Sequence, residues 1–239
     1  MSTGFGPKGY WDQRFASAGF VYGEQPNDFL NEHASGLKAG QALCLAEGEG
    51  RNAVFLAELG HQVCAQDISP VGLRKAEELA HRRGVSINTL CCDLAAFHPE
   101  PASVDLIAAI WMHVEPDLRA RVFQHAIEAL RPGGHLLIEA YSPKQLGFSS
   151  GGPTRQELLI QAAQLRHELA ALEPLILQEI EREIAEGSAH QGPSAVVQFF
   201  GPQTVAVATK NCYSFVTLIP KGMQLDSSQA TGAGTLSGD

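Results

Sequence analysis

The feature that most constrains this chain is a glycine-rich turn that follows a short apolar run. Residues 43–53 read LCLAEGEGRNA, and Asp67 ends the next apolar run about twenty residues after Glu47. Glycine lets the backbone turn sharply beside a ligand, and a helix N-terminus offers free N–H groups. An acid at the end of the second strand can accept hydrogen bonds from both hydroxyls of a ribose. The spacing therefore predicts a strand–helix–strand unit that binds a nucleotide.

Strands and helices alternate along the middle of the chain. The expected strands are 42–46, 62–66, 85–92, 104–112 and 135–141, and the expected helices between them are 51–59, 70–83 and 117–130. A helix over 156–172 and two β runs joined by turn residues, 175–184 and 194–200, are expected to follow. We predict an α/β fold with a single doubly wound, Rossmann-like, mostly parallel sheet, helices on both faces and an antiparallel edge strand.

The composition changes along the chain and predicts three segments. Residues 1–40 are rich in aromatic residues and glycine and are expected to form a lid. Residues 41–202 form the predicted nucleotide-binding domain. Residues 203–239 are expected to be a C-terminal extension whose Ser/Thr/Gly-rich end is disordered.

Charge and cysteine content narrow the expected location and partners. The formal net charge of −9 disfavours nucleic acid and anionic membranes, since both attract basic faces. No apolar run reaches the ~18 residues that a membrane-spanning helix needs. The first residues lack the apolar core of a secretory signal, and five cysteines are an odd number. These features predict a reduced, cytoplasmic protein.

The glycine-rich turn fits two kinds of nucleotide. Gly48, Gly50 and Ala53 also match the dinucleotide fingerprint, whose third small residue can be alanine. Three other features favour S-adenosylmethionine: they are Asp93 after the third strand, the segment AIWMH at residues 109–113, and the turn RPGG at residues 131–134.

Taken in order, these motifs resemble a known family. The pieces that carry the likeness are residues 11–15, 22–30, 47–53, 66–70, 130–134 and 139–143. The chain resembles the class I S-adenosylmethionine-dependent methyltransferases over about residues 8 to 202. Within that family it is most similar to the branch of tellurite-resistance and thiopurine-methyltransferase-like proteins. The resemblance implies S-adenosyl-L-methionine as the cofactor.

The resemblance also implies a set of cofactor-binding residues. The loop from Glu47 to Gly50 would hold the methionine part, Asp67 the ribose, and Asp93 with Leu94 the adenine. The full expected set is Trp11, Tyr22, Glu47, Gly48, Glu49, Gly50, Asn52, Asp67, Ile68, Asp93, Leu94 and Ile110.

The chain departs from the family pattern at two positions in the turn. Cys44 stands where many members have aspartate, and Ala46 stands where they have glycine. We expect Ala46 to need no positive φ, so that cofactor binding survives.

The expected mechanism is alignment of a nucleophile behind an electrophilic sulfonium methyl group, which can supply ~7–11 kcal/mol. No catalytic triad or zinc-binding motif is present, so we expect no metal. His113, just past the fourth strand, is the candidate general base because an imidazole titrates near pH ~6.5. The resemblance alone points to a soft acceptor, such as a thiol or the oxyanion tellurite.

We therefore predict a small-molecule methyl acceptor, with neither nucleic acid nor membrane as partner; the sequence specifies no oligomeric state. Two alternatives stay open. One is an NAD(P)-dependent oxidoreductase that uses the same turn. The other is a non-catalytic protein that binds S-adenosylmethionine.

Overall fold

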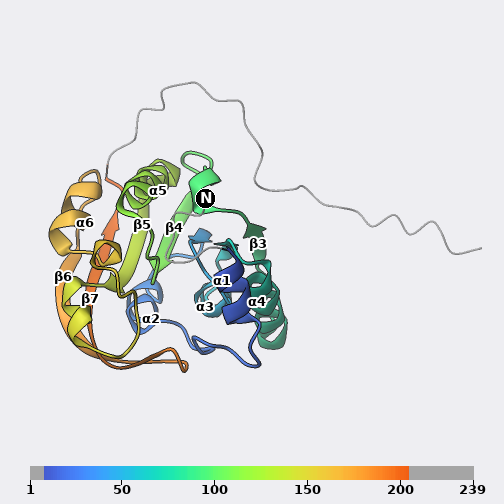
Figure 1. Ribbon diagram of the computed structural model, residues 1–239. Helices are drawn as coiled ribbons and strands as arrows, with labels where there is room; N and C mark the ends of the chain where they lie inside the picture. The colour runs from blue at the N-terminus through green and yellow to red at the C-terminus, as the bar shows by residue number, and fades with distance from the viewer. Residues whose placement is uncertain (1–7, 205–239) are drawn as a thin grey trace, which may run out of the picture.

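The computed structural model describes residues 8–204 and arranges them around one seven-stranded sheet (Figure 1). The strand order is β3-β2-β1-β4-β5-β7-β6. The strands are β1 Gln41–Cys44, β2 Gln62–Asp67, β3 Asn88–Cys91, β4 Val104–Ile110, β5 Leu130–Tyr141, β6 Ile176–Glu186 and β7 His190–Pro202. β7 pairs in the antiparallel sense with both of its neighbours, β5 and β6, and the other strand pairs are parallel. The predicted fold is confirmed, although the antiparallel strand lies one position inside the edge strand β6.

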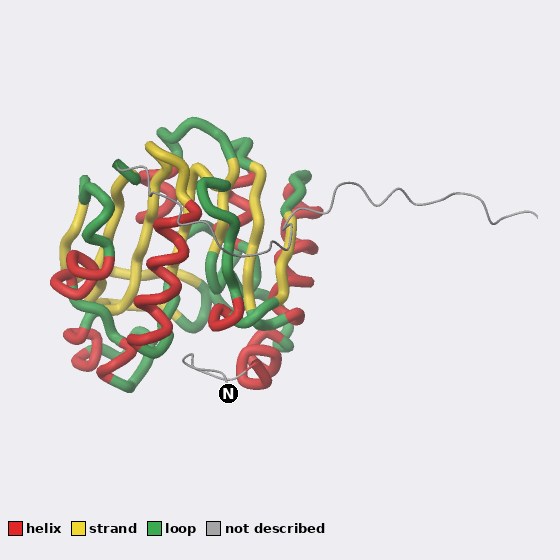
Figure 2. The backbone as a smooth tube through the Cα atoms, turned by 90° about the horizontal axis from the view of Figure 1, so that it is seen from above, coloured by secondary structure: helices red, strands yellow, loops and turns green. Residues whose placement is uncertain are grey.

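Helices cover both faces of the sheet (Figure 2). They are α1 Lys8–Phe15, α2 Asp28–Ala34, α3 Arg51–Glu58, α4 Pro70–Arg83, α5 Pro116–Ala129 and α6 Ala162–Glu168. Ile107 belongs to one buried cluster with Phe123 of α5, and its neighbour Leu106 belongs to another with Leu56 of α3. Successive strand residues point to opposite faces, so β4 contributes to both cores.

Helix ends follow their capping residues. The side chain of Ser69 accepts the N–H of Gly72 at the start of α4, and Gly84 ends that helix with φ 71°. α2 also begins at a capped position, where the Asn27 side chain accepts the N–H of Leu30 at 3.0 Å. The cap is therefore Asn27, and Asp28 is the first residue of the helix.

The expected long helix over 156–172 does not form. A 3-10 turn at Gln156–Leu158 precedes the seven-residue α6, and the connection between them is extended. In that connection Leu159 and Ile160 are buried, and the N–H of Ile160 donates to the carbonyl of Tyr141 at 2.9 Å. The apolar spacing therefore reflects packing beside β5 and not a continuous helix.

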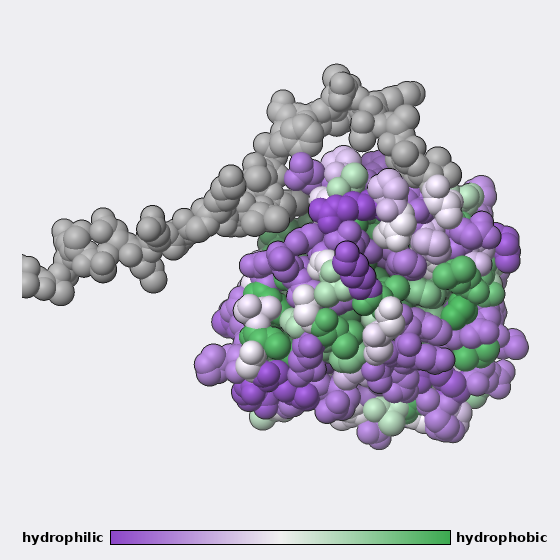
Figure 3. All heavy atoms as spheres, turned by 180° about the vertical axis from the view of Figure 1, so that it is seen from behind, coloured by the Kyte–Doolittle hydropathy of each residue, from purple (hydrophilic) through white to green (hydrophobic). Residues whose placement is uncertain are grey.

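The surface carries no evidence of a bilayer span within the described range. None of the helices in residues 8–204 is both long and apolar enough to cross a membrane. In the view of Figure 3, hydrophilic residues predominate and hydrophobic ones form separate patches. The four cysteines in this range are free thiols. Cys212 and the tail expected to be disordered lie outside the described residues.

Candidate functional site

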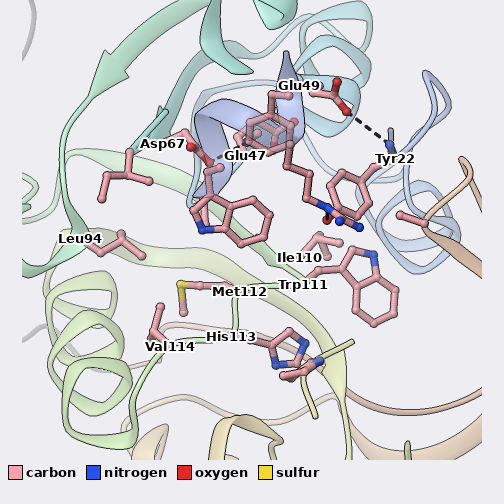
Figure 4. Close-up of a pocket in the computed structure, with 18 of the residues that line it drawn as sticks. Tyr22, Glu47, Glu49, Asp67, Leu94, Ile110, Trp111, Met112, His113 and Val114 are labelled. Atoms are coloured by element: carbon pink, nitrogen blue, oxygen red, sulfur yellow. Dashed lines mark hydrogen bonds between the residues drawn. The ribbon is translucent and has the colours of Figure 1, made fainter. Parts of the chain in front are cut away.

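A cavity of about 330 Å³ opens at the carboxyl ends of β1, β2 and β4. In α/β sheets this is the edge where ligands bind. The residues expected to bind cofactor or act in catalysis that line it are Trp11, Tyr22, Glu47, Gly48, Glu49, Asn52, Asp67, Ile68, Asp93, Leu94, Ile110 and His113. Figure 4 shows many of these side chains directed toward one another. Gly50 alone of the predicted set is absent from the wall.

Gly50 serves the packing of the turn. It has φ 93°, and a Cβ built on it would lie 2.4 Å from the Cβ of Ala76 in α4. Glycine at this position therefore lets α3 and α4 approach closely, behind the face that lines the cavity.

Asp67 ties the turn to the end of β2. Its two carboxylate oxygens accept the N–H groups of Gly48 and Ser69, each at 2.8 Å. Burial raises the pKa of this carboxyl to about 6, although the N–H donors oppose the shift. The carboxylate thus holds the glycine loop in the shape that faces the cavity.

Glu47 caps the helix that follows the turn. One of its oxygens accepts the N–H groups of Asn52 and Ala53, both at 2.9 Å. Burial raises the pKa of the Glu47 carboxyl to about 7. Because this carboxylate occupies the N-terminus of α3, it takes donors that a phosphate would otherwise use. That arrangement favours a cationic ligand over a dinucleotide.

The structure corrects the expectation for Ala46. This residue has φ 50°, in the left-handed region that a Cβ disfavours. The strand must turn here into the glycine loop, and the N–H of Ala46 is held by the Gln66 side chain at 3.1 Å. The alanine is therefore accommodated with strain.

The N-terminal segment covers one side of the cavity. Phe15 of α1 packs against Gly48, and Ser69 at the start of α4 donates to Asp12. The Lys75 ammonium donates hydrogen bonds to the Glu49 carboxylate and to the carbonyls of Phe15 and Ser17, at and just after the end of α1. These contacts place α1 beside α4, as Figure 1 shows.

Aromatic rings form another part of the cavity wall. Trp111 stacks on Tyr141 with ring centroids 4.4 Å apart, and its centroid is 5.1 Å from that of His190. The ring of Tyr22 meets His190 edge-on at 4.7 Å. We refer to Tyr22, Trp111, Tyr141 and His190 as the aromatic wall.

His113 lies at the cavity but has no nitrogen left for catalysis. Its Nδ1 donates to the carbonyl of Leu158 at 2.9 Å, and its Nε2 accepts the N–H of Tyr141 at 3.3 Å. Burial lowers its pKa to about 4. Both nitrogens connect backbone segments, so this geometry argues against the general-base role expected from the sequence.

His190 is the imidazole that sequence reasoning missed. It is buried in the cavity wall, with Nδ1 4.0 Å from a carboxylate oxygen of Glu186. Burial lowers the pKa of His190, which favours the neutral ring. No local motif marks this residue, because only the turn between β6 and β7 brings it to the site.

Comparison with known proteins agrees with this geometry. Residues 42–134 match a family model described as a methyltransferase domain. A tRNA 5-carboxymethoxyuridine methyltransferase from Escherichia coli K12 is 35% identical over 100 residues, which are 40% of this chain and 38% of that protein. The match thus spans well under half the length of this relative.

Solved structures share the fold of this chain. TehB from Haemophilus influenzae superposes with a TM-score of 0.61 at 16% identity, covering 82% of this chain and 66% of TehB. An S-adenosylmethionine-dependent methyltransferase from Aquifex aeolicus gives a TM-score of 0.57 at 16% identity, covering 82% and 98% of the two chains. At these identities the likeness concerns the fold.

The expectation about partners is corrected by the first of these comparisons. The relative that matches this chain over 100 residues acts, by its name, on tRNA. This contradicts the exclusion of nucleic acid and the inference of a small-molecule acceptor. A net charge of −9 averages over the whole chain, whereas nucleic-acid contacts depend on local patches.

Proposed function

We propose that this protein is an S-adenosylmethionine-dependent methyltransferase whose cofactor lies in the cavity at the carboxyl ends of β1, β2 and β4. The observation that carries the proposal is the joint position of the glycine turn, Asp67 and the Asp93–Leu94 segment on one cavity wall. The matched methyltransferase domain includes all three.

The donor set of the cavity suits this cofactor. Four acidic residues line it, Glu47, Glu49, Asp67 and Asp93, and they outnumber the two arginines of the lining, Arg14 and Arg51. Such a lining favours a ligand with a cationic sulfonium and an ammonium group, and disfavours a pyrophosphate. Aromatic faces at the other end can stabilise a sulfonium by ~0.5–2 kcal/mol each.

The proposed roles follow the arrangement along the cavity. Asp67 is assigned to the ribose, and Leu94 and Ile68 to the sides of the adenine. The loop from Glu47 to Gly50 is assigned to the methionine part. The segment from α1 to Tyr22 is assigned the role of a lid, since it packs on Gly48 and Glu49.

The cofactor supplies an electrophilic methyl group, and the protein's task is to align the acceptor and accept its proton. We assign the role of proton acceptor to His190, whose neutral imidazole lies in the aromatic wall. The Glu186 carboxylate, 4.0 Å from Nδ1, then stabilises the protonated ring. This assignment replaces His113, whose nitrogens are both engaged.

The first test is isothermal titration of the full chain with S-adenosylhomocysteine, with NADH as the parallel control. We expect micromolar binding of the thioether nucleoside and none of NADH. Binding of NADH alone would overturn the proposal and favour an oxidoreductase.

The second test is transfer of a labelled methyl group to a panel of acceptors. The panel contains tRNA, a thiol and tellurite, because the relative acts on tRNA while the sequence resemblance pointed to soft nucleophiles. Transfer to any of them supports an enzyme. Cofactor binding without transfer to any of them favours the non-catalytic binder.

A further inference from the structure

A cluster of buried charges lies directly behind the aromatic wall, and only the contact of its member Glu186 with His190 has been assigned a role above. It joins α2, α3, β5 and the end of β6. Its members are Asn27, Arg51, Glu139, Arg182 and Glu186. Buried ion pairs cost desolvation energy, so such a cluster is weak evidence for stability by itself.

Glu186 connects the two ends of the proposed site. One of its carboxylate oxygens accepts both the Arg51 guanidinium and the indole N–H of Trp111, each at 2.6 Å. The other oxygen accepts the Asn27 amide at 2.8 Å. The side chain is 4% exposed, so water does not replace these partners.

Arg51 and Trp111, which share one oxygen of Glu186, belong to different parts of the cavity. Arg51 is the first residue of α3 and follows Gly50 of the cofactor loop directly. Trp111 follows β4 and forms the centre of the aromatic wall. A displacement of either group therefore changes the hydrogen bond that the other makes.

Trp111 needs such a restraint. Its φ is 56°, a left-handed conformation that is rare for a bulky residue. Strained backbone persists only where surrounding contacts hold it, and it clusters at functional sites. Apart from ring packing, the side-chain contact that fixes the indole is its bond to Glu186.

We propose that Glu186 is a positioning residue that fixes Trp111 in the aromatic wall and couples its position to the cofactor loop through Arg51. The proposal rests on the proposed function, because it assumes that the loop holds S-adenosylmethionine. In this proposal the coupling depends on the one Glu186 oxygen that accepts hydrogen bonds from both Arg51 and Trp111.

The test is a double-mutant cycle on the affinity for S-adenosylhomocysteine, measured by titration calorimetry with Trp111→Phe and Glu186→Gln. Phenylalanine keeps a ring but lacks the N–H donor. We expect Trp111→Phe to weaken binding about fivefold in the natural protein and less than twofold in the Glu186→Gln background. Equal effects in both backgrounds would overturn the proposal.

Glu139→Gln is the matched control. Glu139 is a buried carboxylate of the same cluster, bonded to Arg182 and Gln198, but its side chain makes no hydrogen bond to Trp111 or Arg51. We expect Trp111→Phe to have the same effect with and without Glu139→Gln. Equal non-additivity with both glutamates would overturn the proposal, since it would indicate a general loss of order.

Arg51→Lys covers the case in which Glu186→Gln does not fold. It weakens the link to the cofactor loop while leaving the Glu186–Trp111 bond in place, so Trp111→Phe should again cost less than twofold. A full fivefold effect there contradicts the coupling. Failure of the natural protein to bind S-adenosylhomocysteine would overturn the proposed function instead. A failure of the coupling proposal is thus distinguishable from a failure of the proposed function.

Discussion

At the scale of single residues, the glycine-rich turn departs from ideal geometry at one alanine. Ala46 adopts φ 50° between β1 and the glycine loop. A Cβ in the left-handed region costs roughly 1–2 kcal/mol. The turn is therefore a place where a smaller residue improves stability.

We predict that Ala46→Gly raises the free energy of unfolding by about 1 kcal/mol. The gain is smaller than the strain removed, because glycine adds conformational entropy to the unfolded chain. Urea unfolding monitored by circular dichroism measures it. Ala65→Gly in β2, a buried position without positive φ, should destabilise the protein instead.

We predict that His113 contributes mainly to the stability of the protein and His190 mainly to its turnover. His113→Ala leaves the carbonyl of Leu158 and the N–H of Tyr141 without their partner, which we expect to cost about 2–4 kcal/mol of stability. His190→Ala should instead slow methyl transfer about 100-fold with a smaller loss of stability. Thermal melts and single-turnover assays of both variants check this. Full-rate transfer by His190→Ala rules out the base assignment.

At the scale of elements, the hairpin of β6 and β7 reaches from the sheet edge to the cavity. Its turn docks on the N-terminal segment, where Ser188 donates its N–H to the carbonyl of Val21 at 2.9 Å. Gly187 lies so close that an added Cβ would sit 2.3 Å from that carbonyl oxygen. The hairpin therefore brings both His190 and Glu186 to the site and holds the proposed lid.

We predict that Gly187→Ala displaces this contact and weakens S-adenosylhomocysteine binding by about tenfold. Gly84→Ala is the matched control, since Gly84 has a similar φ of 71° but nothing within 4 Å of an added Cβ. Both variants carry the same backbone strain, so calorimetric titration isolates the effect of the contact. Equal affinities of the two variants contradict the docking role.

At the scale of the whole molecule, burial of Glu47 in the glycine-rich turn links the stability of the protein to pH. The folded-state pKa of Glu47 is raised to about 7 from an ordinary value of 4.5. The folded state therefore binds this proton more tightly than the unfolded state. The resulting stabilisation is complete below pH 4.5 and is lost as the pH rises through 7.

We predict that Glu47→Gln removes this dependence. Glutamine keeps an oxygen for the N–H groups of Asn52 and Ala53 but carries no charge to desolvate. Between pH 5 and 8, the free energy of unfolding of the variant should rise relative to that of the natural protein by an amount on the order of 3 kcal/mol. Parallel pH profiles from urea unfolding would show that Glu47 ionises as it does in water.

The sequence by itself determined the parts of this protein that depend on near neighbours along the chain. Short apolar runs, Ser69 and Gly84 at the ends of α4, and the spacing from Glu47 to Asp67 are features of short stretches of chain, because hydrogen bonding and capping within an element act over a few residues. These local features were enough to predict the parallel sheet and that Glu47 and Asp67 line one cavity.

Only the tertiary structure decided the rest of the site. Glu186 lies 75 residues from Trp111 and 135 residues from Arg51, yet it bonds both. His190 and His113 are chemically equal in the sequence, and their roles differ only in which backbone groups packing places around them. Contacts over such separations form only when β7 pairs with β5. The free energy that favours this pairing comes from burial of whole faces of the sheet and not from any local pattern.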